Sequence, residues 1–235
     1  MHEATASQRN IPAMDTTKGS GALDGKRYLE SLRDGREVWY RGERIDDVTS
    51  HPEFSQMAKS IARIYDMQHA QETRDVMTYE QDNGLRASYS YFLPTKPEHL
   101  LLRRRNTEVW VREVFGMCGR LPDFCASMVI GYYDIRHELA KLNPDLARNT
   151  ETYLKYARDH DLCLSHGLHD PCMDKSLRPS QDPDRCVRVV KERDDGIVVR
   201  GARFNTFGVF SNEILISPTY MFTEDEPEFA LWFTI

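Results

Sequence analysis

The sequence predicts an α+β protein in which a mainly helical part comes first and a β-rich part follows. Apolar residues recur at helical spacing in the first part, most clearly at Phe54, Met57, Ala58, Ile61 and Tyr65. After Leu162 the pattern changes to short runs of β-branched and aromatic residues bounded by turns. We therefore expect a disordered leader at residues 1–20, a helical domain at 21–162 and a β domain, a sheet or small barrel, at 163–235.

Within the helical part, two β-hairpins are expected between the helices. The first covers residues 38–45 and turns at Arg41-Gly42. The second covers residues 76–93 and turns at Asn83-Gly84, because Asn-Gly readily adopts the positive φ angles of a tight turn. Helical patterns cover residues 23–32, 53–65, 98–118, 122–132 and 150–160.

Four runs in the last part are expected to be strands: residues 186–190, 196–200, 213–216 and 229–233. The last run reaches Ile235 in mid-strand. A domain rarely stops there, because the strand edge and its apolar face would lack partners. We therefore expect that sequence is missing beyond Ile235, so that the β domain is incomplete.

Composition favours an ordinary cytoplasmic protein. The 235 residues carry a formal charge of −6 with both signs mixed, which is not the basic footprint of a nucleic-acid-binding protein. No run approaches the roughly 18 apolar residues of a membrane span, and the first twenty residues lack the apolar centre of a secretory signal. The five cysteines form no CxxC pair, which favours reduced thiols and gives no metal site.

Two segments are candidates for chemistry. In the first, Gly119–Phe124, Arg120 lies at a break between two helices, where a cation and unpaired N–H groups could hold an anion. From spacing alone, the commoner role for such an arginine is structural: Arg120 would pair with Asp123 or cap the preceding helix. In the second, Leu164–Pro171, His166 lies on a segment expected to be irregular, and its imidazole could hydrogen-bond a substrate hydroxyl. A metal site there lacks further ligands at a defined spacing.

Several blocks together resemble the 4-hydroxyphenylacetate 3-hydroxylase family, in the family's own order from about residue 23 to the end. The similar blocks are residues 28–38, 42–44, 47–52, 119–124, 161–166 and 192–202. The resemblance implies an acyl-CoA dehydrogenase-like fold whose C-terminal helical bundle is absent from this chain.

The same resemblance implies the oxygenase component of a two-component monooxygenase. Such a protein takes reduced FAD from a separate flavin reductase, reacts it with O₂ to a flavin hydroperoxide, and hydroxylates a phenol ortho to its hydroxyl. Family members are tetramers. Without the bundle, we expect this chain to bind FAD poorly and to turn over little.

By position, Arg120 corresponds to the family's substrate-binding arginine and His166 to its histidine at the phenolic hydroxyl. Phe124 stands where the family has a tyrosine, so a hydroxyl is lost, and 4-hydroxyphenylacetate itself is in doubt as the substrate. The flavin-contacting positions correspond to Cys172, Met173, Asp174, Lys175, Arg178, Ser180, Gln181 and Thr206.

Two alternatives remain open at this stage. The family also contains a 4-hydroxybutyryl-CoA dehydratase and vinylacetyl-CoA isomerase branch, which holds an iron–sulfur cluster through cysteines and a histidine. Cys118 and Cys125 lie seven apart, which is not that branch's close cysteine pair. The other alternative is a catalytically inactive, truncated remnant.

Overall fold

The computed structural model describes residues 19–117, 123–171, 174, 176–218 and 221–235. Its α-helices are α1 Gly25–Ser31, α2 Ser55–Met67, α3 Arg74–Met77, α4 Pro97–Glu113, α5 Asp123–Asp134, α6 Arg136–Leu142 and α7 Pro144–Asp159. Short 3₁₀ turns are η1 Tyr89–Tyr91, η2 Pro179–Gln181, η3 Pro183–Arg185, η4 Gly208–Phe210 and η5 Pro227–Phe229. No helix among these residues is long and apolar enough to cross a membrane.

Both predicted hairpins are present. β1 Val38–Tyr40 pairs with β2 Glu43–Ile45, and Arg41 and Gly42 at the turn have φ of 51° and 83°. β3 Thr78–Glu80 pairs with β4 Arg86–Ser88. The second hairpin is shorter than expected, because its flanks form α3 and η1 instead.

The main sheet has four strands in the order β10-β9-β5-β8. They are β5 Leu164–His169, β8 Phe204–Asn205, β9 Glu213–Ile216 and β10 Phe233–Thr234. β5 pairs in parallel with β9 and antiparallel with β8. A separate hairpin joins β6 Arg188–Arg193 to β7 Gly196–Arg200. The described strands form no closed barrel.

Two expectations about strands were wrong. Residues 164–171 were expected to be irregular, yet 164–169 form an inner strand; residues 164–167 are all buried, so they lack the alternation that marks a half-exposed strand. Residues 229–233 were expected to be one strand, yet only Phe233 is in a strand. Pro227 favours a turn, and the Phe229 N–H donates to the Glu226 carbonyl at 3.3 Å, which closes η5.

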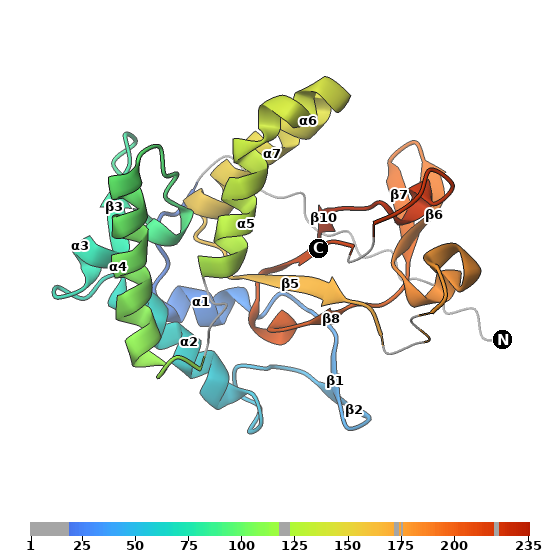
Figure 1. Ribbon diagram of the computed structural model, residues 1–235. Helices are drawn as coiled ribbons and strands as arrows, with labels where there is room; N and C mark the ends of the chain where they lie inside the picture. Colours follow the sequence, from blue (N-terminus) through green and yellow to red (C-terminus); the bar gives the residue numbers. More distant parts are fainter. Residues whose placement is uncertain (1–18, 118–122, 172–173, 175, 219–220) are drawn as a thin grey trace.

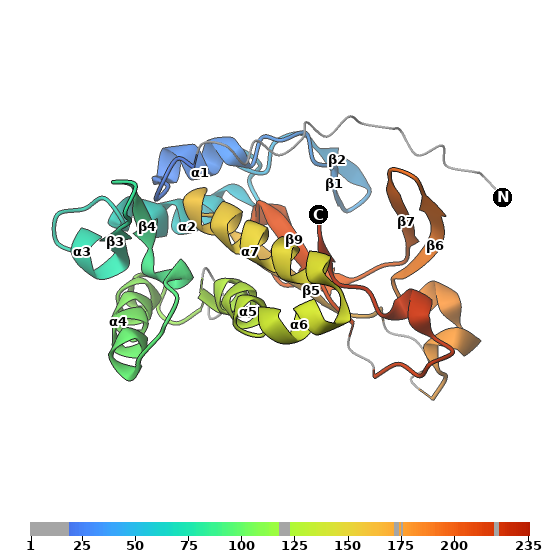
Figure 2. The same cartoon turned by 90° about the horizontal axis from the view of Figure 1, so that it is seen from above.

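Figure 1 shows the α-helices gathered at one side of β5 and the β6–β7 hairpin at the other. α5 and α6 run outward and α7 returns beside them, and the view from above shows the same arm (Figure 2). The outer end of this arm is polar or exposed: α6 has no buried residue, and Leu142 is 80 % exposed.

The hydrophobic cores join the helical and strand parts. Tyr28 of α1 is fully buried, and its hydroxyl donates to the carbonyl of Phe210 at 2.8 Å. Phe210 and Cys163 belong to the same apolar cluster as α1 and α2, while Leu164 and Leu215 pack with α5 and α7. Burial of side chains of this size stabilises by about 1.5–3 kcal/mol each. The domain boundary after residue 162 stays a prediction.

Candidate functional site

Four of the predicted site residues, Arg120, Cys172, Met173 and Lys175, lie outside the described residues, as does Cys118. The remaining ones fall into four places. Phe124 is in the first turn of α5, His166 is in the middle of β5, and Asp174, Arg178, Ser180 and Gln181 follow β5. Thr206 is exposed, directly after β8.

His166 is held inside the main sheet. It lies opposite Leu215 in the parallel β5–β9 pair and is only 4 % exposed. A hydrogen bond of 2.7 Å joins its Nε2 to the hydroxyl of Ser217, which is also buried and follows β9 directly. Which partner donates depends on the imidazole tautomer. Ser217 therefore fixes the orientation of the ring, a role that sequence reasoning missed.

Phe124 lies beside His166 although one residue comes from helix α5 and the other from strand β5. Their ring centroids are 6.0 Å apart with an interplanar angle of 38°. Phe124 is 38 % exposed, so the ring pair connects the buried imidazole to the surface. The structure thus brings together two of the three residues predicted to contact substrate.

The start of α5, which carries Phe124, is fixed by a residue from α4. The Arg103 guanidinium donates to Asp123 Oδ1 at 3.2 Å, to Ser127 Oγ at 2.6 Å and to the Ser90 carbonyl at 3.1 Å. The Arg103 side chain is only 11 % exposed. Although Arg103, Arg104 and Arg105 form a basic run that could be a solvated surface, Arg103 instead orients the first turn of α5.

The described part of the segment predicted to contact flavin, Asp174 and residues 176–181, is held by local hydrogen bonds. Asp174 accepts hydrogen bonds from the Ser176 N–H and hydroxyl, at 2.9 and 2.7 Å. The Arg178 N–H donates to the Gln181 side-chain oxygen at 2.8 Å, and the Gln181 N–H donates to the Arg178 carbonyl at 3.0 Å. These reciprocal bonds close η2 and its cap residue Arg178, so Arg178, Ser180 and Gln181 lie together.

A buried carboxylate that sequence reasoning missed lies next to this turn. Glu226 is completely covered and accepts hydrogen bonds from Arg178 Nε at 3.2 Å and from the Ser180 hydroxyl at 2.8 Å. A second contact joins Arg178 Nη2 to Glu226 Oε2. The guanidinium holds the pKa of Glu226 well below its usual range, and the bonds from Ser180 and Thr223 act in the same direction. In the sequence, Glu226 ends an acidic run that gives no sign of burial.

A buried ion pair fixes the end of β5. Arg203 Nη1 and Asp170 Oδ1 are 2.6 Å apart, and their side chains are 5 % and 8 % exposed. Arg203 also donates to the Leu168 carbonyl at 3.2 Å. Next to Thr206, the Phe207 N–H donates to Ser165 Oγ at 3.1 Å. Among the described residues, no hydrogen bond or ion pair joins Thr206 to Arg178, Ser180 or Gln181.

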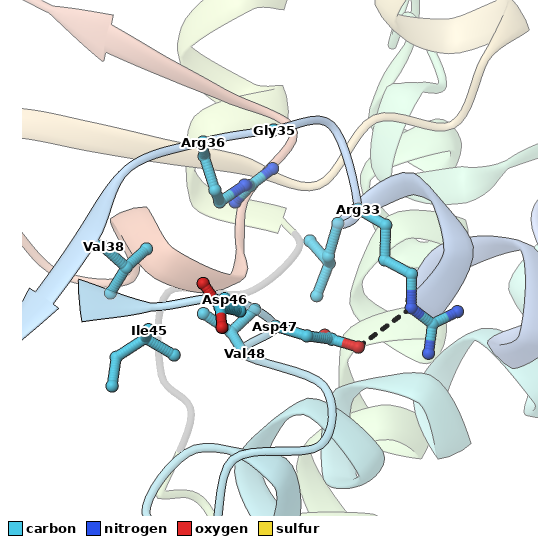
Figure 3. Close-up of a pocket in the computed structure, with 9 residues that line it drawn as sticks. Arg33, Gly35, Arg36, Val38, Ile45, Asp46, Asp47 and Val48 are labelled. Atoms are coloured by element: carbon cyan, nitrogen blue, oxygen red, sulfur yellow. Dashed lines mark hydrogen bonds and ion pairs between the residues drawn. The ribbon is translucent and has the colours of Figure 1, made fainter.

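A cavity of about 260 Å³ lies elsewhere, between α1 and the first hairpin (Figure 3). Arg33 and Arg36 border it, but both are already bound by carboxylates: Arg33 donates to Asp47 at 3.1 Å and Arg36 to Asp34 at 2.7 Å. Arg36 also donates to the Ser211 carbonyl at 2.8 Å. We interpret this cavity as part of the packing between the end of α1 and the first hairpin, since none of the predicted site residues lines it.

Residues 24–235 match the family model described as the N-terminal part of 4-hydroxyphenylacetate 3-hydroxylase. The chain belongs to this family. The family's fold is acyl-CoA dehydrogenase-like, so the expected fold class, a mixture of helices and sheet, is confirmed. The resemblance inferred from the sequence blocks is confirmed as well.

Named relatives are oxygenase components. The chain is 35 % identical over 217 residues to the 4-hydroxyphenylacetate 3-monooxygenase oxygenase component of Thermus thermophilus, covering 91 % of this chain and 44 % of the relative. It is 39 % identical over 183 residues to the 4-nitrophenol 2-monooxygenase oxygenase component of a Rhodococcus species, covering 77 % and 34 %. The chain thus spans less than half the length of these relatives.

Solved structures agree with the sequence relatives. The oxygenase component HpaB complexed with FAD and 4-hydroxyphenylacetate superimposes with a TM-score of 0.83 at 35 % identity, over 91 % of this chain and 44 % of that one. An archaeal 4-hydroxybutyryl-CoA dehydratase from N. maritimus gives a TM-score of 0.80, over 91 % and 43 %. Its identity is only 23 %, so this second likeness concerns the fold alone.

Proposed function

We propose that this chain provides the phenol-binding part of a two-component, FADH₂-dependent monooxygenase that hydroxylates a phenolic compound ortho to its hydroxyl. The observation that carries the proposal is the pairing of buried His166 with the ring of Phe124 in a chain of this family. The relatives named above act on 4-hydroxyphenylacetate and 4-nitrophenol, which are both phenols. The shared chemistry is therefore a phenol with a substituent opposite its hydroxyl.

In this proposal His166 hydrogen-bonds the phenolic hydroxyl and stabilises the negative charge that develops on it. The hydrogen bond to Ser217 holds the ring orientation, so the imidazole does not have to reorganise when substrate binds. Phe124 forms an apolar wall beside it and helps to exclude water. Arg120 would bind the anionic or polar end of the substrate, and it lies outside the described residues.

The proposed cofactor is FAD, with O₂ as co-substrate. Arg178 and Thr206 are exposed and offer a guanidinium and a hydroxyl, and Gln181 adds an amide. Ser180 lies beside them, but its hydroxyl donates to Glu226. This set of donors fits a cofactor whose ring and phosphates are rich in acceptor oxygens. When bound, the reduced flavin would supply the two electrons with which O₂ gives one oxygen atom to the phenol and one to water. The chain's own residues bind, orient and shield the reactants.

The proposed partners follow from the two-component organisation. A separate flavin reductase would supply reduced FAD, and the assembled oxygenase would be a homotetramer acting in the cytoplasm.

An anaerobic titration of the chain with reduced FAD, followed by O₂ and a panel of para-substituted phenols, tests the proposal. Because this chain is expected to bind FAD poorly, we expect saturable but weak flavin binding and small amounts of catechol, identified by mass spectrometry. The mass spectrometry must be sensitive enough to detect less than one catechol per protein chain. If reduced FAD does not bind and no phenol is hydroxylated, the proposal is wrong for this chain.

His166 provides the sharper arm of this experiment. His166→Asn should lower the catechol formed per flavin oxidised by about 10²-fold, with hydrogen peroxide formed instead, because the charge developing on the phenol loses its partner. The matched control is His137→Asn in exposed α6, which should behave as the unchanged chain. Equal catechol yields from both variants would reject the role of His166.

A further inference from the structure

Glu226 joins two segments that are 46 residues apart along the chain. Its Oε1 accepts from Arg178 Nε at 3.2 Å and from the N–H and hydroxyl of Ser180 at 3.3 and 2.8 Å. Its Oε2 accepts from the N–H and hydroxyl of Thr223 at 3.3 and 3.1 Å and also contacts Arg178 Nη2. In Figure 2 the η5 turn, in dark red, lies beside the orange η2 and η3 turns.

The carboxylate is saturated, so it cannot itself bind a ligand. Three donors converge on each of its oxygens, and no part of the residue is exposed. A neutral isostere could not replace it, because a glutamine has one acceptor oxygen and its amide would meet donors on the other side. The donors around Glu226 therefore require a carboxylate at this position, and the carboxylate holds Arg178, Ser180 and Thr223 in place.

Arg178 is held along one edge only. Its Nε and Nη2 are used by Glu226, and Nη2 also approaches the Met221 carbonyl at 3.4 Å. The side chain is 44 % exposed, and within the described residues no acceptor is recorded for Nη1. A guanidinium anchored in this way is preorganised, so that less side-chain entropy is lost when its other edge binds an oxygen acceptor.

We propose that Glu226 is a positioning residue that fixes the Arg178–Gln181 turn in the conformation that binds the flavin, with the second edge of Arg178 directed to an acceptor oxygen of FAD. This inference rests on the proposed function. Glu226 does not touch the cofactor, and its effect is exerted through Arg178 and Ser180.

Hydrogen exchange on the 235-residue chain without flavin tests the positioning. Glu226→Gln should speed exchange at least ~10-fold in peptides covering 176–182 and 221–226, because both segments lose fixed acceptors. The matched control is Glu224→Gln, an exposed neighbour in the same turn, which should leave exchange unchanged. Peptides from α2 and β5 report whether the rest of the fold is retained. Unchanged exchange at 176–182 would overturn the proposal.

Flavin titration of the same variants tests the consequence. Glu226→Gln should weaken reduced FAD binding about 10-fold or more and change the absorption spectrum of bound oxidised FAD, whereas Glu224→Gln should do neither. A purely structural role would change the amount of folded protein but not the spectrum of the bound flavin. Should Glu226→Gln unfold, Ser180→Ala, which removes one donor, must show the same two changes in smaller degree.

The outcomes separate the two proposals. If the unchanged chain binds reduced FAD and Glu226→Gln binds it equally well with the same spectrum, the positioning role is wrong and the proposed function stands. If the unchanged chain does not bind reduced FAD, the proposed function is wrong and the positioning role is wrong with it.

Discussion

Asp161 on the helical side and Glu226 on the strand side are both buried carboxylates that connect distant segments, yet their acidities are shifted in opposite directions. Asp161 is 3 % exposed and accepts from the Leu23 N–H at 2.9 Å and from Gln68 Nε2 at 2.6 Å. Burial raises the pKa of Asp161 to about 6, and its hydrogen bonds only partly oppose this. At Glu226 the Arg178 guanidinium keeps the pKa well below its usual range.

The difference teaches that burial does not decide the charge of a carboxylate; its partners do. Neutral donors stabilise the anion of Asp161 less than water would, so burial dominates. A guanidinium beside Glu226 reverses the balance. Consequently the helical side should be most stable when Asp161 is protonated. The contacts between Glu226 and the Arg178–Gln181 turn should be most stable when Glu226 is ionised.

The largest effect is expected from removing the acceptor on the helical side. Asp161→Ala leaves the Leu23 N–H and the Gln68 amide without their acceptor, and Asp161 has a φ of 50°, which alanine adopts poorly. The free energy of unfolding at pH 5, measured by urea denaturation, should fall by about 3 kcal/mol. A loss below about 1 kcal/mol would mean that this junction does not depend on Asp161.

The next effect tests the pKa itself. Asp161→Asn keeps the acceptor, because both hydrogen bonds go to Oδ2, and asparagine tolerates the positive φ. Below pH 3.8 the carboxyl is protonated in both the folded and unfolded states; above pH 6 it is ionised in both, and the folded state bears the unfavourable burial. The stability that protonated Asp161 contributes to the folded state is therefore lost as the pH rises through 6.

Relative to the unchanged chain, the free energy of unfolding of Asp161→Asn should increase by up to about 3 kcal/mol between pH 4 and pH 7.5. Paired urea denaturation curves at the two pH values measure this difference directly. Parallel pH dependences for the two chains would show that Asp161 ionises normally.

A smaller effect of opposite sign is expected on the strand side. The depressed pKa of Glu226 stabilises the fold above its unfolded value near 4.5, and this contribution is lost as the pH falls. Arg178→Met removes the cation. The free energy of unfolding should then be lower at pH 7, and it should fall less as the pH drops below about 4.5. The effect is limited because Arg178 is 44 % exposed to solvent screening. The control is Arg193→Met in exposed β6, which should leave the pH dependence unchanged.

The smallest effect on stability is expected where the two sides meet. Phe124→Tyr adds a hydroxyl to a ring that is 38 % exposed, so the free energy of unfolding should change by less than about 0.5 kcal/mol. Under the proposed function, kcat/KM for phenols with a polar para substituent should rise about 10-fold relative to unsubstituted phenol. An unchanged preference between para-substituted phenols and phenol would show that Phe124 does not line the substrate pocket.

Local sequence signals predicted the elements that depend on neighbours in the chain. The apolar stripe of α2 and the Arg41-Gly42 and Asn83-Gly84 turns need only short-range geometry, and they were found. The inner strand β5 was missed because all residues from 164 to 167 are buried, which removes the alternating pattern.

The site was predictable only where a family motif marked it. Phe124 and His166 come from such motifs, and the structure brings their rings together. Glu226 was missed because its acidic neighbours resemble a solvated turn. Arg103 was missed because successive residues of a helix point in different directions, so it is 11 % exposed while adjacent Arg104 is 73 % exposed.

The contacts of η4 have a consequence for the order in which the protein folds during synthesis. Tyr28 and Arg36, near the start, bind the carbonyls of Phe210 and Ser211, more than 170 residues later. Phe210 also belongs to the apolar cluster of α1 and α2, and β5 pairs with β9 across a long intervening segment. Contacts between residues so far apart in the sequence form slowly. The core of α1 and α2 can therefore be completed only after residue 211 has been synthesised.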